Sequence, residues 1–224
     1  MHFDRFLIST VYIELNLDKE QEVIMSIKIY VFPKGPLTEN TYLVVDEASG
    51  DKAVIDPGYF GSDIAELIGD KESLKYILLT HAHGDHIFAL QDYKDEYPDA
   101  EVTVGADDKM HLITDSLNGS TQMGKKVECT ANILVQDGDK LVLGDSEISC
   151  IHTPGHTPGG VCYLFDKTMF SGDTLFFASV GATHFPGGSW EDLQKSIKEK
   201  LYTLPDDVKV HPGHGQPTSI GFER

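Results

Sequence analysis

The most constraining feature of this sequence is the segment THAHGDH at residues 80–86, which directly follows the apolar run 76–79. Such a run predicts a buried strand, and a strand that ends in a tight loop presents alternate side chains on one side. His81 and His83 can therefore converge on one metal ion, because imidazole nitrogens are common metal ligands. A polar loop with chance histidines is the alternative, but three of only ten histidines fall in this segment. The segment therefore predicts a metal site.

The second half of the segment predicts a second ion. Gly84 lets the backbone turn, so that Asp85 and His86 can face another metal. Residues 87–97 have apolar residues at helical spacing, and Pro98 would end such a helix. Asp85 would then lie at a helix start, where the partial positive charge of the helix favours the ionised carboxylate that metal binding needs.

The pattern of apolar runs and turns predicts an α+β fold. We expect strands at 27–32, 41–46, 53–56, 74–79, 101–105, 133–135, 140–143, 148–152, 161–165, 169–171 and 208–210. We expect helices from 62 or 63 to 68, at 87–97, at 107–114 and from 189 or 191 to 201, with an irregular surface loop or lid at 115–131. Strands thus fill two halves of the chain, and helices finish each half. This order suits two sheets packed face to face with helices outside.

The composition is that of a globular protein with a real core. A length of 224 residues with 40% hydrophobic and 24% charged residues indicates one domain, which we place at 26–224. Residues 1–25 read as a dispensable leader or an over-extended start, because they lack the features of a targeting segment. The net charge of −18 argues against nucleic acid as a partner, since phosphate binding needs a basic surface. No apolar run is long enough to span a membrane.

The cysteines and lysines give two further expectations. Cys129, Cys150 and Cys162 form no C-x-x-C pair and are odd in number, which fits a reducing cytosol and a cytoplasmic protein. Cys150 and Cys162 lie in apolar runs and are expected to be buried, inert thiols. The doubled lysine at 125–126 can anchor an anionic substrate, although a solvated loop charge is the simpler interpretation.

Four motifs in order resemble those of one known family. The pattern H-x-H-x-D-H resembles the signature of the metallo-β-lactamase superfamily and is formed by His81, His83, Asp85 and His86. Three later segments match the same family, namely TPGHTPG at 153–159, SGDT at 171–174 and HPGHG at 211–215. The resemblance covers roughly residues 26–224 and implies an αββα sandwich, in agreement with the pattern of strands.

The resemblance also implies a complete set of ligands for two metal ions. The ligands that it implies are His81, His83 and His156 for the first ion, Asp85, His86 and His214 for the second, and Asp173 as a bridge between them. Nitrogen and carboxylate ligands without thiolates suit zinc, manganese or iron. We therefore expect two divalent ions, with zinc as the first choice and iron or manganese as alternatives.

Within the family, the chain is most similar to glyoxalase II, the hydroxyacylglutathione hydrolases, and to their shorter relatives. Residues 173–176 and the ending P-G-H-G carry this similarity. The similarity implies thioester hydrolysis by a metal-bound hydroxide at a dinuclear site, with Asp85 as the catalytic residue that ligates and orients it. The substrate would be a small molecule, and the enzyme a monomer or homodimer.

Two departures from glyoxalase II leave the thiol of the substrate open. The chain ends soon after His214, without the helical extension that helps glutathione-using relatives to bind the tripeptide. Their glutathione-contacting Lys and Tyr correspond to Ala182 and His184 here. We expect His184 to contact substrate, against the alternative of a loop histidine with no role. Trp190 is expected to pack under the loop of His184, and His111 gives no functional signal.

Other functions stay open. Persulfide dioxygenases of the same fold resemble the chain and bind one iron through two His and one Asp, which His81, His156 and Asp173 match. A lactonase or β-lactamase activity is a second alternative, because this fold hosts many chemistries. A non-catalytic binding module would be expected to lack at least one ligand, and none is missing.

Overall fold

The structure, a computed structural model, describes residues 27–224. The expected leader at residues 1–25 lies outside the described residues. Six strands form the first sheet in the order β1-β2-β3-β4-β5-β6. Their bounds are Ile27–Pro33, Asn40–Asp46, Lys52–Ile55, Leu74–Leu78, Glu101–Gly105 and Ile133–Val135. β1, β2 and β3 pair antiparallel, whereas β3, β4, β5 and β6 pair parallel, so the sheet is mixed.

Six further strands form the second sheet in the order β14-β13-β10-β9-β8-β7. From β7 to β10 they span Lys140–Leu143, Ser146–His152, Val161–Phe165 and Thr168–Gly172, followed by β13 at Lys209–Pro212 and β14 at Thr218–Ser219. Two short strands, β11 (Leu175–Phe176) and β12 (Ser179–Val180), pair with each other. Since β9 runs antiparallel to both β8 and β10, and β13 runs parallel to β10, the strands β8, β10 and β13 all point the same way.

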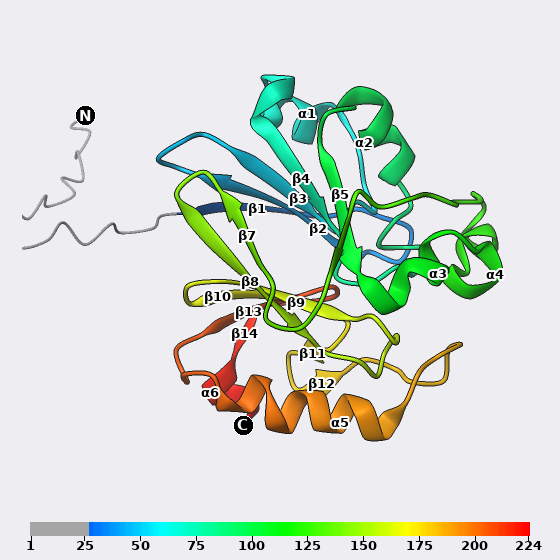
Figure 1. Ribbon diagram of the computed structural model, residues 1–224, viewed down its shortest axis with the longest axis vertical. Helices are drawn as coiled ribbons and strands as arrows, with labels where there is room; N and C mark the ends of the chain where they lie inside the picture. Colours follow the sequence, from blue (N-terminus) through cyan, green and yellow to red (C-terminus); the bar gives the residue numbers. More distant parts are fainter. Residues whose placement is uncertain (1–26) are drawn as a thin grey trace, which may run out of the picture.

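Helices cover the outer faces of the two sheets (Figure 1). The α-helices are α1 (Ser62–Ile68), α2 (Leu90–Glu96), α3 (Lys109–Leu112), α4 (Asp115–Asn118), α5 (Trp190–Glu199) and α6 (Ile220–Glu223). Four 3-10 turns lie beside them at Lys71–Ser73 (η1), Ala106–Asp108 (η2), Ser120–Met123 (η3) and Leu201–Thr203 (η4). Among residues 27–224, no helix is long and apolar enough to cross a membrane.

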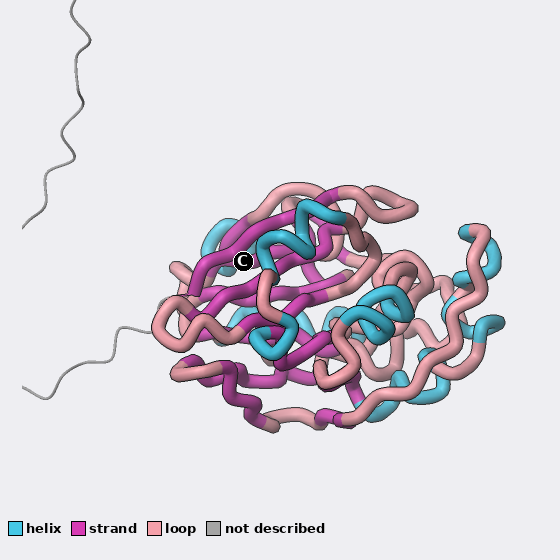
Figure 2. Tube along the Cα trace, turned by 90° about the horizontal axis from the view of Figure 1, so that it is seen from above, coloured by secondary structure: helices cyan, strands magenta, loops and turns pink. Residues whose placement is uncertain are grey.

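Three buried clusters follow these layers, with α1 and α2 above the first sheet and α5 below the second (Figures 1 and 2). Neighbouring residues of one strand belong to different clusters, because side chains alternate between the faces of a sheet. On β2, Leu43 packs with the α1 and α2 side, whereas Val44 packs between the sheets. On β10, Phe170 packs between the sheets, whereas Met169 packs against Leu193 of α5. The fold is therefore the expected αββα sandwich, of the α+β class.

Three expected helical or loop segments differ from the structure. The helix expected at 87–97 begins only at Leu90, and residues 84–89 form turns, so the prediction that Asp85 lies at a helix start was wrong. The helix expected at 107–114 is split into η2 and α3, because Asp108 turns its buried side chain toward neighbouring loops. The segment 115–131, expected to be irregular, contains α4 and η3.

The end of the chain and Trp190 also differ from expectation. β14 and α6 follow the last expected strand, and the short turn before them gave no apolar run by which to predict them. Trp190 is 53% exposed at the first turn of α5 rather than packed beneath a loop. The three cysteines are buried and free, as expected for Cys150 and Cys162.

Hydrogen bonds join the two sheets near the ends of β4 and β13, the strands that lead into two of the histidine motifs. The hydroxyl of Tyr163 on β9 donates to the carbonyl of Leu79 at 3.0 Å, and that of Tyr42 donates to the carbonyl of Pro212 at 2.7 Å. The N–H of Val161 donates to the carbonyl of Thr80 at 2.8 Å. Loops from both sheets are thereby held at one edge of the sandwich.

We expect Phe170→Ala to lower the free energy of unfolding by about 3–5 kcal/mol, because it leaves a cavity between the sheets. The fully buried Phe170 ring lies 5.0 Å from that of Tyr42 and 5.3 Å from that of His211, between ring centroids. Urea unfolding followed by circular dichroism measures the change. Phe222→Ala is the control, since Phe222 is 61% exposed. Equal losses in both variants would contradict the central position of Phe170.

Candidate metal centre

All seven side chains named by the sequence motifs meet at this edge of the sandwich. They lie in loops that follow four strands, namely residues 80–86 after β4, 153–160 after β8, Asp173 after β10 and His214 after β13. The ends of β8, β10 and β13 lie together because these strands point the same way. The cross-sheet hydrogen bonds place the loop after β4 opposite them. Residues far apart in sequence thus form one polar cluster.

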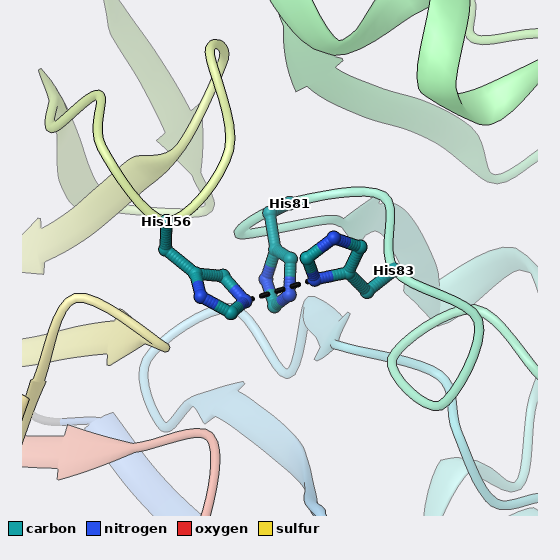
Figure 3. A group of neighbouring side chains, drawn as sticks. All are labelled: His81, His83 and His156. Carbon is teal, nitrogen blue, oxygen red and sulfur yellow. Dashed lines mark hydrogen bonds between the residues drawn. The ribbon is translucent and has the colours of Figure 1, made fainter. Parts of the chain in front are cut away.

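One group consists of three buried histidines, His81, His83 and His156 (Figure 3). Their exposed fractions are 2%, 8% and 5%, and each offers a ring nitrogen within 4.8 Å of the others. Nδ1 of His83 lies 2.8 Å from Nε2 of His156, and the ring of His81 stands beside this pair. Three neutral imidazoles that converge in this way can share one cation.

A second group of potential ligands lies at the same edge of the sandwich. Ligand atoms of Asp85, His86 and His214 all lie within 4.8 Å of one another. Nε2 of His214 lies 3.2 Å from Asp85 Oδ2, and Nε2 of His86 lies 3.7 Å from the same oxygen. Asp173 lies between the groups, since its Oδ1 is 3.3 Å from His86 Nε2 and its Oδ2 is 3.5 Å from His156 Nε2.

Hydrogen bonds on the outer ring nitrogens leave the inner nitrogens free to bind a metal. Nδ1 of His86 lies 2.9 Å from the carboxylate of Asp56, and Nδ1 of His156 donates to the carbonyl of Ala182 at 2.6 Å. Each contact makes Nδ1 a protonated nitrogen, so Nε2 is the ring atom that is directed into the site. Among the described residues, Nε2 of His81, Nε2 of His86 and Oδ1 of Asp173 are buried without a hydrogen-bond partner. Buried polar atoms are rarely left so, and a cation would satisfy them.

The pKa shifts agree with neutral imidazoles in the first group and ionised carboxylates in the second. Burial, reinforced by neighbouring histidines, lowers the pKa of His81 and lowers that of His83 to about 3. Burial raises the pKa of the Asp85 carboxyl, but His86 and His214 outweigh this effect and hold it below its usual range. The pKa of Asp173 is lowered in the same way by His86.

The charge balance of the site also fits a divalent cation. Asp56, Asp85 and Asp173 are all buried or nearly so. Within residues 27–224 their ion pairs are with histidines, and none is with a lysine or arginine. Burying several carboxylates without a fixed cation is costly, and a bound metal ion would offset that cost.

Asp56 supports the second group, although the sequence pattern predicts it only as the last residue of a strand. Its Oδ1 accepts the N–H of Thr80 at 2.8 Å, and its Oδ2 accepts the hydroxyl of Thr80 at 2.7 Å as well as facing His86. Asp56 has φ +50, a conformation that non-glycine residues rarely adopt. This turn directs the carboxylate back toward the loop after β4, so the strain is linked to the site.

Asp108 holds together the two loops that carry the three-histidine group. The fully buried carboxylate accepts the N–H of Ala82 at 3.0 Å, the hydroxyl of Thr157 at 2.8 Å and the N–H of Gly159 at 2.7 Å. Ala82 lies between His81 and His83, whereas Thr157 follows His156 directly. Asp108 therefore sets the spacing of these histidines, and no motif in the sequence pointed to it.

The segment of His214 is fixed to the first sheet by two residues that precede β2 or begin it. Glu39 pairs with His214 in an antiparallel bridge, and Asn40 donates its amide to the carbonyls of Pro212 at 3.0 Å and Gly215 at 2.9 Å. Glu39 is fully buried, and burial raises the pKa of its carboxyl to about 7. These contacts position His214 from across the sandwich.

Gly84 lies in a turn, as expected, and also allows a neighbouring segment to pack closely on the site. A Cβ at Gly84 would lie 2.6 Å from Cα of Ser120, so the absence of a side chain allows η3 to pack on the histidine loop. The N–H of Gly84 donates to the carbonyl of Asn118 at 2.8 Å. The segment expected to be a lid is therefore a packed wall of the site.

The remaining candidates lie farther out. His184 is exposed, and its ring lies 4.2 Å from that of Phe185, between centroids. His184 does not line the cavity beside the cluster, so its contact with substrate stays a prediction. Lys125 pairs with Asp92 at 2.8 Å, outside that cavity. His111, which gave no signal, is buried and lies 3.1 Å from the carbonyl of Pro186 through Nε2.

We expect Asp108→Asn to weaken divalent-metal binding by about 10–100-fold, because an amide cannot accept all three hydrogen bonds that space the histidines. Competition with a chelator measures the affinity, and circular dichroism checks the fold. Asp107→Asn is the matched control, since the neighbouring side chain is 68% exposed. Unchanged affinity in a folded Asp108→Asn protein would show that the carboxylate does not position the histidines.

Comparisons with known proteins agree with this fold. The family model of the metallo-beta-lactamase superfamily matches residues 35–214. The probable metallo-hydrolase YqgX of Bacillus subtilis is 38% identical and covers 86% of this chain and 92% of its own length. The hydroxyacylglutathione hydrolase GloC of Haemophilus influenzae is 33% identical, and the match covers 88% of this chain and 94% of GloC.

Solved structures give the same result. The B3 metallo-beta-lactamase BLEG-1 has a TM-score of 0.79 with 34% identity and covers 88% of this chain and 96% of its own. TTHA1623 in a di-iron-bound form has a TM-score of 0.74 with 32% identity, covering 87% and 96%. ETHE1 from Myxococcus xanthus has a TM-score of 0.69 with 28% identity, covering 89% and 81%. The chain thus belongs to the metallo-beta-lactamase superfamily.

Proposed function

We propose that the protein is a metal-dependent hydrolase that cleaves small-molecule thioesters at a dinuclear site. The observation that carries the proposal is the convergence of seven nitrogen and carboxylate donors in overlapping groups at one edge of the sandwich. The same donors lie at a cavity of about 360 Å³, which His83, Asp85, His156, Asp173 and His214 help to line. A substrate can therefore reach the groups that would act on it.

Zinc is the ion we propose, since nitrogen and carboxylate donors suit it. Iron and manganese are compatible with the same donors. The di-iron form of TTHA1623 supports keeping iron as an alternative. When bound, such ions make water a nucleophile at neutral pH and polarise a carbonyl. His81, His83 and His156 would hold the first ion, Asp85, His86 and His214 the second, and Asp173 both.

The protein's own residues would orient the reactants. Asp85 is ionised at neutral pH, since its carboxyl pKa lies below its usual range, and it can accept a hydrogen bond from the attacking water. Asp56 fixes the ring of His86 through Nδ1, which keeps Nε2 directed at the site. The wall formed by α4 and η3 excludes bulk water from one side.

The thioester is the finer part of the proposal. It is supported by the motif similarity to glyoxalase II and by the 33% identity to a protein named a hydroxyacylglutathione hydrolase. B3 metallo-beta-lactamase BLEG-1 is compatible with a lactam or lactone as substrate. A thioester is an activated acyl group with a good leaving group, so the same set of donors suits it well.

A mononuclear iron persulfide dioxygenase is the alternative, and the likeness to ETHE1 from Myxococcus xanthus is compatible with it. That reaction would use His81, His156 and Asp173 and leave the other four donors without a function. The buried and unpartnered Nε2 atom of His86, which the dioxygenase would not use, favours the dinuclear hydrolase. Oxygen uptake with glutathione persulfide, in the absence of thioester hydrolysis, would instead establish the dioxygenase.

We expect Asp85→Asn to lower kcat for thioester hydrolysis by about 10²–10⁴-fold while the fold is retained, because the amide keeps the shape and removes the charge that orients water. A thiol-reactive chromophore reports the released thiol, and thermal unfolding checks the fold. Asp99→Asn is the control, since Asp99 is exposed and follows the C-terminal end of α2. Wild-type activity in a folded Asp85→Asn protein would refute the proposed role.

A further inference from the structure

The cavity beside the metal centre combines uncharged polar side chains, such as Gln122, with a group of large apolar ones. Its outer wall includes Leu37, Leu117, Met123, Phe185 and Pro186, which come from three separate segments of the chain. Leu37 is 55% exposed and Phe185 is 41% exposed, so the apolar surface extends to the mouth. Large apolar side chains rarely stay exposed together in a cavity unless they contact a ligand.

Positive charge is missing from this wall. Among residues 27–224, no lysine or arginine lines the cavity, and the polar side chains of the wall, such as Gln122, carry no charge. The lysines of neighbouring segments are already paired, Lys34 with Asp63 and Lys125 with Asp92. The whole chain has a net charge of −18. Bound metal ions would offset charge at the reaction centre, but the wall itself would offer an anionic group no cationic partner.

Phe185 is the apolar wall residue whose ring lies beside the three-histidine group. Its ring centroid lies 5.0 Å from that of His83 and 5.7 Å from that of His156. The loop of Phe185 is held by a hydrogen bond from Gly188 N–H to the Phe185 carbonyl at 2.9 Å and by the contact of His111 with Pro186 at 3.1 Å. Phe185 is therefore a fixed apolar wall directly over the three-histidine group.

From these observations, and resting on the proposed function, we infer that the enzyme selects thioesters whose thiol part is uncharged and apolar close to the carbonyl. The cavity of about 360 Å³ accommodates a short aliphatic or aryl group. A thioester of glutathione, which carries carboxylates, would find no cation on this wall. Phe185 is the residue that we assign as the determinant of this preference.

The metal-loaded full chain should be tested with thioesters that share one acyl group and differ only in the thiol. The neutral member is the N-acetylcysteamine thioester, and the anionic member is the 3-mercaptopropionate thioester. We expect kcat/KM to be at least about tenfold higher for the neutral member, the scale on which an apolar pocket discriminates. Equal values, or a higher value for the anionic member or for S-lactoylglutathione, would overturn the inference while supporting thioester hydrolysis.

If the enzyme hydrolyses none of the tested thioesters, that result would instead contradict the proposed function. In that case, calorimetric binding of the two matching thioethers, which cannot be cleaved, measures the preference of the cavity separately. Tighter binding of the neutral thioether would support an apolar site, and equal or tighter binding of the anionic one would overturn it.

A pair of phenylalanine variants tests the assigned residue. We expect Phe185→Ala to reduce the neutral-to-anionic ratio of kcat/KM by about tenfold, mainly through KM, and Phe185→Leu to restore most of the preference. Phe177→Ala is the matched control, because Phe177 is also 41% exposed but stacks on Phe222, with centroids 4.9 Å apart, and does not line the cavity. An unchanged ratio in Phe185→Ala, or an equal loss in Phe177→Ala, would contradict the assignment of Phe185.

Discussion

The structure depends most on two buried carboxylates that stand behind the histidines. Asp56 binds the loop after β4 through Thr80 and His86, and Asp108 joins that loop to the one that follows β8. Loops lack the regular backbone pairing of strands, so charged acceptors give their N–H groups strong partners. The clustered imidazoles are thereby held at spacings that a flexible loop would not maintain, which is what a preformed metal site needs.

The fold could be predicted from the sequence because its signals are local. Apolar runs bounded by Gly and Pro marked most strands, and alternation on β2 and β10 reflects layers on both sides of each sheet. The prediction failed at Asp85, because residues 84–89 form turns in which Gly84 packs against Ser120, and helical spacing cannot reveal such a contact. The segment 115–131 was misjudged because its short helices are stabilised by Asn118 and Ser120, not by an apolar stripe.

The candidate site could likewise be predicted where its signals are local in the sequence, and not where they depend on tertiary contacts. Motifs named the seven residues that the structure brings together, since each motif is short and continuous. Asp108, Glu39 and His111 could not be found this way, because their roles arise from distances across the fold rather than from spacing along the chain. The apolar wall around Phe185 likewise consists of residues from three segments that are distant in the sequence. Residues that support or shape a site therefore require the tertiary structure.

The central claim is that seven donors form one site for two divalent ions. Mass spectrometry of the folded chain, purified without added metal and then equilibrated with zinc and desalted, measures zinc, iron and manganese per chain. We expect a total of about two ions per chain, falling to about one in the double variant Asp85→Asn/His214→Ala, which alters two donors of the second group. One ion or none in the unaltered chain would contradict the dinuclear site.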